Sequence, residues 1–305
     1  MRSSHPAATR EEAGGAFLRR RPRKKALLLF PLLAFSLLTL LLAAHPSWSA
    51  PSPEGKQPSA AATAAKVDPI WEQARSEVRS GVLNTLVHQR AALASGLSRY
   101  RIIHGPRDRR EIALTFDDGP HAVFTLKLLD ILRRAHVKAT FFLVGEMAEK
   151  RPDLVKAQLA EGHCLGNHTY HHVSLTQLPL GTAAAELKAC GNVLRDITGQ
   201  SPRWFRPPGG DIDTDIYLAA RALGYKTVLW NVFPGDSRRP GRLTIKSRVL
   251  DESGPGGIVL LHDGIQQTLD VLPEIIATLK ARGYRFVTLD EMLLPRTAAS
   301  ESAHR

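Results

Sequence analysis

The chain has 305 residues, of which 43% are hydrophobic, so it can bury the core of one large domain and carry additional segments. Its formal net charge of +12 would suit a nucleic-acid binder. Half of that excess, however, lies within residues 1–25, which hold eight lysines and arginines against two glutamates. No later stretch groups lysine and arginine with aromatic residues, as a nucleic-acid surface would. Composition therefore argues against nucleic acid as a partner.

An uncharged apolar stretch, residues 26–44, directly follows this basic flank. As a helix it would be about 28 Å long at about 1.5 Å per residue, close to the thickness of the hydrocarbon core of a bilayer. A basic cytoplasmic flank, an apolar stretch and small residues up to Ala50 are typical of an export signal. Residues 26–50 are thus predicted to be a cleaved signal peptide or a retained anchor, and both remain open. We expect the rest of the chain to be periplasmic or otherwise extracytoplasmic, either free or held at the inner membrane by one helix.

Three segments surround the main domain. Residues 51–66, rich in Pro, Ser and Ala, are predicted to form a flexible linker. A ragged apolar stripe then predicts a helical arm over residues 67–104, which either packs on the main domain or serves the approach of a partner or substrate. The main domain is expected over residues 105–295, followed by a short tail, 296–305.

The chain contains two cysteines, Cys164 and Cys190. An exported protein permits a disulfide between them. We favour two buried free thiols, and two cysteines are too few for a cysteine-based metal site.

Short apolar runs alternate with amphipathic stretches throughout the main domain. Strands are expected at 111–116, 138–144, 164–167, 204–206, 226–230, 257–262 and 285–287. Helices are expected between them, at 124–136, 154–161, 182–198, 215–223, 241–252 and 269–282. Repeated strand–helix units predict an α/β fold with a parallel sheet, a distorted (β/α) barrel of about seven strands. In such a fold, the residues that carry the chemistry lie at the C-terminal ends of the strands.

Acidic and histidine residues follow two of these strands. Asp117 and Asp118 end the first, where one carboxylate can bind a metal ion and the other accept a proton, although a solvated turn would have the same sequence. After the third strand, His168 and His172 are four residues apart, so one helical turn would place them on the same side. With Asp118 they make a two-histidine, one-carboxylate set that suits zinc or a related divalent ion. His171 would face away from it.

Two other strands end in candidate groups. His262 emerges from an apolar strand and is a candidate general acid, although a structural histidine is equally consistent with the sequence. Arg206, followed by two prolines, can pair with a carboxylate.

The chain contains four motifs in this order: Thr-Phe-Asp-Asp-Gly-Pro, His-Thr-x-x-His, Arg-Pro-Pro and Leu-x-His. Together they resemble the motifs of the polysaccharide deacetylases of carbohydrate esterase family 4. The resemblance covers about residues 107–294 and makes residues 105–295 a catalytic domain. It implies a hydrolase that removes N-acetyl groups from an envelope or extracellular polysaccharide such as peptidoglycan, chitin oligomers or poly-N-acetylglucosamine. It also implies a divalent metal cofactor, with zinc foremost and cobalt or nickel as alternatives.

The roles of the family carry over to the matching positions. Asp117 would be the general base and Arg206 would orient it. The metal ligands would be Asp118, His168 and His172.

The remaining roles fall on residues of the later motifs. His262 would protonate the leaving amine, and Asp236 would keep His262 cationic. Leu260 would line the pocket for the acetyl methyl group, and Gly209 would supply a backbone N–H to the oxyanion. The family usually has an aromatic residue in place of Gly209 and a tryptophan in place of Ser237. These departures concern the size and preference of the substrate more than the chemistry.

Two other functions remain open from the sequence. One is a non-catalytic glycan-binding module on the same fold, which would require a broken catalytic set. The other is a related hydrolase of carbon–nitrogen bonds that acts on small amides or imides.

Overall fold

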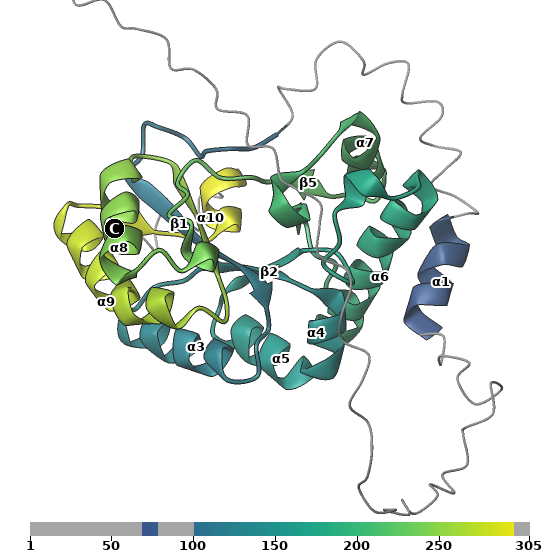
Figure 1. Cartoon of the computed structure of the whole chain (residues 1–305), viewed down its shortest axis with the longest axis horizontal. Helices are drawn as coiled ribbons and strands as arrows, with labels where there is room; N and C mark the ends of the chain where they lie inside the picture. Colours follow the sequence, from purple (N-terminus) through teal and green to yellow (C-terminus); the bar gives the residue numbers. More distant parts are fainter. Residues whose placement is uncertain (1–68, 79–100, 296–305) are drawn as a thin grey trace, which may run out of the picture. The chain divides into compact units, whose positions relative to one another are not determined.

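The structure is a computed structural model, and it describes residues 69–78 and 101–295 (Figure 1). The predicted basic flank, the signal or anchor segment at 26–50, the linker and the C-terminal tail lie outside the described residues, as does most of the helical arm. Within the described ranges, no helix is long and apolar enough to cross a membrane.

Seven strands form one parallel sheet, which confirms the predicted α/β class. The strands are β1 (Glu111–Gly119), β2 (Thr140–Leu143), β3 (Cys164–Asn167), β4 (Trp204–Phe205), β5 (Lys226–Thr227), β6 (Gly257–His262) and β7 (Arg285–Phe286). Their order is β5-β4-β3-β2-β1-β6, and β7 pairs with the start of β1. Beyond β5, Val232 forms a bridge with Val259 of β6, and Leu260 N–H donates to the Val232 carbonyl at 3.0 Å. This contact links the two edges of the sheet, consistent with a distorted (β/α) barrel.

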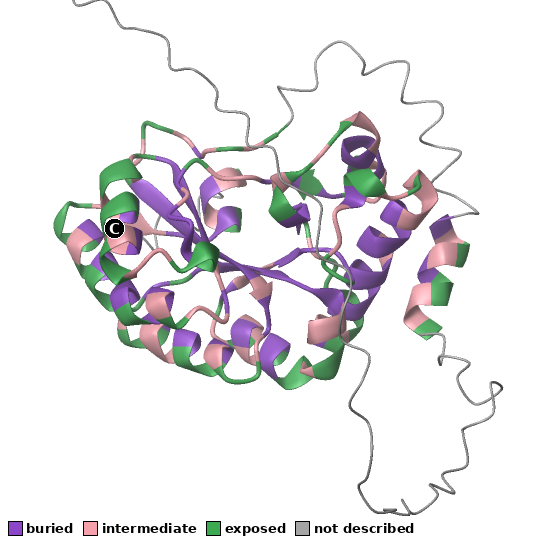
Figure 2. Cartoon of the chain, viewed as in Figure 1, coloured by how far each residue is buried: buried purple, intermediate pink, exposed green. Residues whose placement is uncertain are grey.

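The helices are α1 (Pro69–Glu77), α3 (Phe124–Arg134), α4 (Gly145–Lys150), α5 (Pro152–Ala160), α6 (Leu180–Thr198), α7 (Thr214–Ala222), α8 (Arg242–Glu252), α9 (Gln266–Ala281) and α10 (Leu289–Leu293). Most of them cover the outer side of the sheet, while α1 packs on α6, and α10 packs against the cluster that contains Ala113 and Phe142. Helices α9, α3, α5, α4 and α6 follow one another along the sheet in Figure 1. Buried residues line the strands and the inner helix faces, and exposed residues lie on the outer helix faces (Figure 2).

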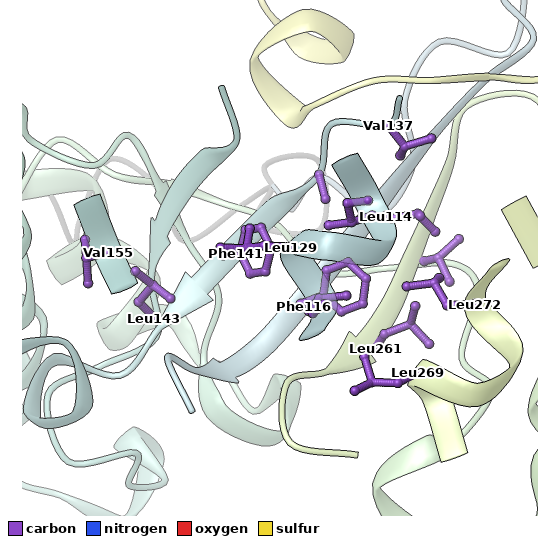
Figure 3. Close-up of a cluster of buried hydrophobic side chains, with 14 of the residues drawn as sticks. Leu114, Phe116, Leu129, Val137, Phe141, Leu143, Val155, Leu261, Leu269 and Leu272 are labelled. Carbon is purple, nitrogen blue, oxygen red and sulfur yellow. The ribbon is translucent and has the colours of Figure 1, made fainter. Parts of the chain in front are cut away.

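Side chains of β1 alternate between two environments. Leu114 and Phe116 belong to the hydrophobic cluster between the sheet and the outer helices, where Phe116 stacks on Phe141 of β2 with ring centroids 5.4 Å apart (Figure 3). Because successive strand residues point to opposite faces, Thr115 and Asp117 face the interior of the barrel. This alternation places the first carboxylate of the Asp-Asp pair inside the sheet, at the C-terminal end of its strand.

Some predicted bounds were wrong, each for a local reason. The strand predicted over 226–230 ends at Thr227, because the next two carbonyls, those of Val228 and Leu229, accept hydrogen bonds from the Arg206 guanidinium at 3.2 and 3.0 Å. Helices α4 and α10 were not predicted, since both are too short to show a helical apolar period. Of the predicted helical arm, 67–104, the structure describes α1, Val78 and residues 101–104. The last four residues are not helical, because the backbone of Ile102 pairs with Thr227 and Leu229. Both cysteines are free, as favoured from the sequence.

Candidate active site

Asp117 is fixed inside the barrel by an arginine that is fully buried. The Asp117 carboxylate is only 3% exposed, and its Oδ1 accepts a hydrogen bond from Arg206 Nη1 at 2.8 Å. The same Nη1 donates to Thr115 Oγ1 at 2.7 Å, and the guanidinium lies 4.1 Å from the ring centroid of Phe142. Burial lowers the pKa of Arg206, and the charge of Asp117 limits this drop. Since an unpaired buried charge is costly, the pair holds the carboxylate in one orientation, with Oδ2 left to face the other site residues.

A change of register brings Asp118 to the same rim as its neighbour. In a regular strand the two adjacent carboxylates would point to opposite faces of the sheet. The pairing of β1 with β2 shifts between Phe116 and Gly119, and Asp118 has a left-handed φ of 68°. An irregularity of this kind re-aims a side chain at the end of a strand. Two consecutive acids can therefore serve one site.

Asp118, His168 and His172 converge as a candidate metal centre. One ligand atom from each of the three lies within 4.8 Å of the others. Asp118 Oδ1 is 3.0 Å from His172 Nε2 and 3.4 Å from His168 Nε2. Burial by itself raises the pKa of Asp118, but the two facing imidazoles more than offset this and hold it well below its usual range. The charge and hydrogen bonding of Asp118 in turn raise the pKa of His172.

The tautomer of His168 shows that this set suits a cation. His168 is buried, and its Nδ1 lies 2.8 Å from the Arg206 carbonyl oxygen, to which it can only donate. In the neutral ring, Nε2 then presents a lone pair toward Asp118 Oδ1, 3.4 Å away, and the same oxygen lies 3.0 Å from His172 Nε2. Two electron-rich atoms that face each other are stable with a positive charge between them. A second ring nitrogen bonded to a carbonyl is also the usual support of a metal-binding histidine.

The two histidines do not lie on a helical turn, so that part of the prediction was wrong. Residues 168–172 form an irregular loop in which Thr169 and His172 have left-handed φ values of 68° and 57°. Asn167 Oδ1 accepts the Thr169 N–H at 2.8 Å and starts the turn. This loop still places the ring centroids of His168 and His172 5.0 Å apart. A local side chain competed with the backbone hydrogen bonds that a helix would need.

Sequence reasoning missed Glu186, which supports this loop from α6. Its carboxylate is buried and accepts the backbone N–H groups of Tyr170 and His171 at 2.9 and 2.8 Å. His171 Nδ1 lies 2.7 Å from the other carboxylate oxygen, so this imidazole points away from the metal candidates, as expected. The available signal was a single acid within the apolar run Ala-Ala-Ala-Glu-Leu of the predicted helix.

His262 lies at the end of β6 and is paired with a buried acid. It is aligned with Asp117 in the register of β1 and β6. Its Nδ1 is 2.7 Å from Asp236 Oδ1, and its backbone N–H donates to Asp236 Oδ2 at 2.9 Å. Thr268 Oγ1 also donates to that oxygen, at 2.8 Å. Burial lowers the pKa of His262, but the hydrogen bond and charge of Asp236 outweigh it, so the pKa is raised above its usual value. His262 can therefore hold a proton on Nε2 at the rim.

Comparisons with known proteins agree with the motifs and the fold. The family described as polysaccharide deacetylase matches residues 104–228. A peptidoglycan-N-acetylglucosamine deacetylase of Bacillus cereus is 41% identical over 192 residues, which are 62% of this chain and 70% of that protein. The chain belongs to the polysaccharide deacetylase family.

Other family members extend this likeness. The peptidoglycan-N-acetylmuramic acid deacetylase PdaA of Bacillus subtilis is 31% identical over 70% of this chain and 80% of that protein. The crystal structure of the Bc1960 peptidoglycan N-acetylglucosamine deacetylase, a complex with 4-naphthalen-1-yl-N-oxidanyl-benzamide, has a TM-score of 0.63. It is 38% identical and covers 66% of this chain and 96% of that one.

Leu260 and Gly209, the two residues predicted to contact the substrate, differ in their surroundings. Leu260 is buried and precedes His262 by two residues on β6, so both side chains face the barrel interior. Gly209 is exposed, and a Cβ placed on it would meet only Asp211 Oδ2, at 3.7 Å. Its φ of 67° is left-handed, a conformation in which an aromatic side chain would be strained.

Proposed function

We propose that the chain is a metal-dependent N-deacetylase of a polysaccharide that contains N-acetylglucosamine, with peptidoglycan as the first substrate to test. The observation that carries this proposal is the arrangement at one rim of a fixed carboxylate, a cation-binding triad and a histidine paired with a buried acid. The relatives named as peptidoglycan deacetylases support the choice of polymer. We also propose that residues 26–50 export the chain, as a signal peptide or an anchor, because its substrate lies outside the cytoplasm.

Asp118, His168 and His172 would hold the divalent ion. Two imidazoles and one carboxylate suit zinc, and they also accept cobalt or nickel. When bound, such an ion would polarise the acetyl carbonyl and lower the pKa of a water molecule toward about 7.

Asp117 and His262 would move the two protons of the reaction. Asp117, held by Arg206, would accept the proton of the attacking water through its free carboxylate oxygen. His262, kept protonated by Asp236, would donate a proton to the amine as the carbon–nitrogen bond breaks. Since the two residues are aligned across β1 and β6, they can act on opposite parts of one amide.

Leu260 and Gly209 would contact the substrate. Leu260 would pack against the acetyl methyl group, and the Gly209 backbone N–H would donate to the oxyanion. The open space around Gly209 leaves room for a substituted sugar.

The test is acetate release by the full purified chain. Substrates are peptidoglycan, chitin oligomers, poly-N-acetylglucosamine and acetylxylan, with metal content measured on the same sample. We expect release from a glycan that carries N-acetylglucosamine, its loss with a chelator and its return with zinc. A metal-loaded chain that releases no acetate from any of the four substrates would contradict the proposal. Glycan binding without acetate release, unchanged in Asp117→Asn, would instead favour a non-catalytic binding module.

A further inference from the structure

A cluster of three rings connects α1 to the loop that carries His168 and His172. Trp71 of α1 lies edge-on to His171, with ring centroids 5.0 Å apart and planes at 75°. It also stacks on Tyr170, whose centroid is 6.1 Å away. Tyr170 and His171 are in edge contact with each other at 4.6 Å. The imidazole of His171 is therefore held between an aromatic contact from α1 and the buried carboxylate of Glu186.

Glu186 couples this ring contact to the backbone of the loop. Its two carboxylate oxygens form hydrogen bonds with the Tyr170 N–H, the His171 N–H and the His171 imidazole. One buried acid therefore bonds the two residues immediately before His172. On the other side of the loop, the Gly145 and Glu146 N–H groups of α4 donate to the carbonyls of Thr169 and Tyr170 at 2.9 and 3.0 Å. Freeing the loop would leave a buried carboxylate without its donors, which is costly.

His172 is the ligand candidate that most needs this support. Its φ of 57° is left-handed, a conformation that is strained for a residue other than glycine. Its side chain is 44% exposed, whereas that of His168 is 2% exposed, so neighbouring side chains restrain it less. If the loop relaxed to ordinary φ values, the imidazole would turn away from Asp118.

We propose that Trp71, His171 and Glu186 are positioning residues for His172, and that α1 thereby contributes to metal affinity. This rests on the proposed metal site. Helix α1 precedes the residues 104–228 that match the family, so the contribution comes from outside the shared motifs. Helix α1 is held against the domain by the burial of Ala74 and by a 3.0 Å ion pair between Glu77 and Lys188 of α6.

The experiment measures metal affinity of the full chain for Zn²⁺ and Co²⁺ by competition with a chromophoric chelator. Loss of a residue that orients a metal ligand typically costs about 10- to 100-fold in affinity, and we expect that range for Glu186→Gln. Trp71→Ala removes the ring contacts with Tyr170 and His171 but no hydrogen bond of the loop, and we expect a smaller loss, about three- to tenfold on the same scale. Trp71→Phe keeps a ring against His171 and should restore affinity to near that of the wild type. The visible absorption of bound Co²⁺ should change in Trp71→Ala, because the placement of His172 changes.

Glu72→Gln is the matched control. It removes an exposed ion pair to Arg75 within α1 and leaves the ring cluster and the docking of α1 in place, so it should change neither metal affinity nor the Co²⁺ spectrum. Because Glu186→Gln alters a buried group, Trp71→Ala, whose side chain is only partly buried, carries the test if Glu186→Gln does not fold. Unchanged affinity and spectrum in Trp71→Ala would overturn the inference, even if the chain releases acetate. Weakened metal binding in the variants of a chain that releases no acetate would support the inference while contradicting the proposed function.

Discussion

Replacement of Asp236 by asparagine tests whether His262 keeps its proton through one buried carboxylate. Asp236 is fully buried, and its Oδ1 lies 2.7 Å from His262 Nδ1. Burial lowers the pKa of His262, and the hydrogen bond and charge of Asp236 raise it by more. A charge of opposite sign at such a distance shifts a pKa by about one to three units. Asp236→Asn removes that charge, so the pKa of His262 should fall by about the same amount.

The effect on activity has a defined direction. His262 donates its proton only when it is protonated, so activity is lost as the pH rises through its pKa. In Asp236→Asn this loss should begin about one to three pH units lower than in the wild type. At a pH above the pKa of His262 in both proteins, kcat/KM of Asp236→Asn should be about 10- to 1000-fold lower than that of the wild type. Each unit by which the pKa falls lowers the protonated fraction of His262 about tenfold. At a pH below both values the two proteins should be similarly active.

The assay is kcat/KM for acetate release between about pH 5 and about pH 9, the range in which histidines titrate. Ser237→Ala is the control, since Ser237 is exposed and its contact with Asp236 is made by its backbone N–H. Thermal unfolding shows that both variants are folded. A pH profile of Asp236→Asn that runs parallel to that of the wild type would refute the reasoning.

Three other perturbations have clear expected results. Asp117→Asn should retain the metal and lower kcat by about 10²- to 10⁴-fold, because it removes the proton acceptor and no ligand, as acetate release and metal analysis on one sample will show. His168→Ala should lose the metal in the same analysis. Removal of the ion from the wild type should lower the melting temperature of the protein, since an ion at 100 times its Kd stabilises a fold by about 2.7 kcal/mol. Gly209→Ala should cost about 1 kcal/mol in denaturant unfolding because its φ is left-handed, whereas Gly254→Ala, with an ordinary φ and open space around it, should be close to neutral.

The positions of the strands along the chain could be predicted because strands buried on both faces form short, continuous apolar runs. The bounds of β3 and β6 agree with the prediction, since a polar residue, Asn167 or His262, ends each strand. The short helices had no such pattern. Helix α10 could have been found from its capping box, in which Thr288 and Glu291 bond each other's backbone N–H, a signal independent of length.

The candidate metal ligands show how residues that lie together in the structure can be predicted from an incorrect local geometry. A spacing of four predicts neighbours on a helix, yet His168 and His172 meet across a loop with two left-handed residues. That loop is held by Glu186 and by the first N–H groups of α4, which are distant in the sequence. Local spacing contains no information about such contacts. The same five-residue segment in a chain without Glu186 would keep the motif and lose the support that aims His172 at Asp118, so the motif alone does not specify a binding site.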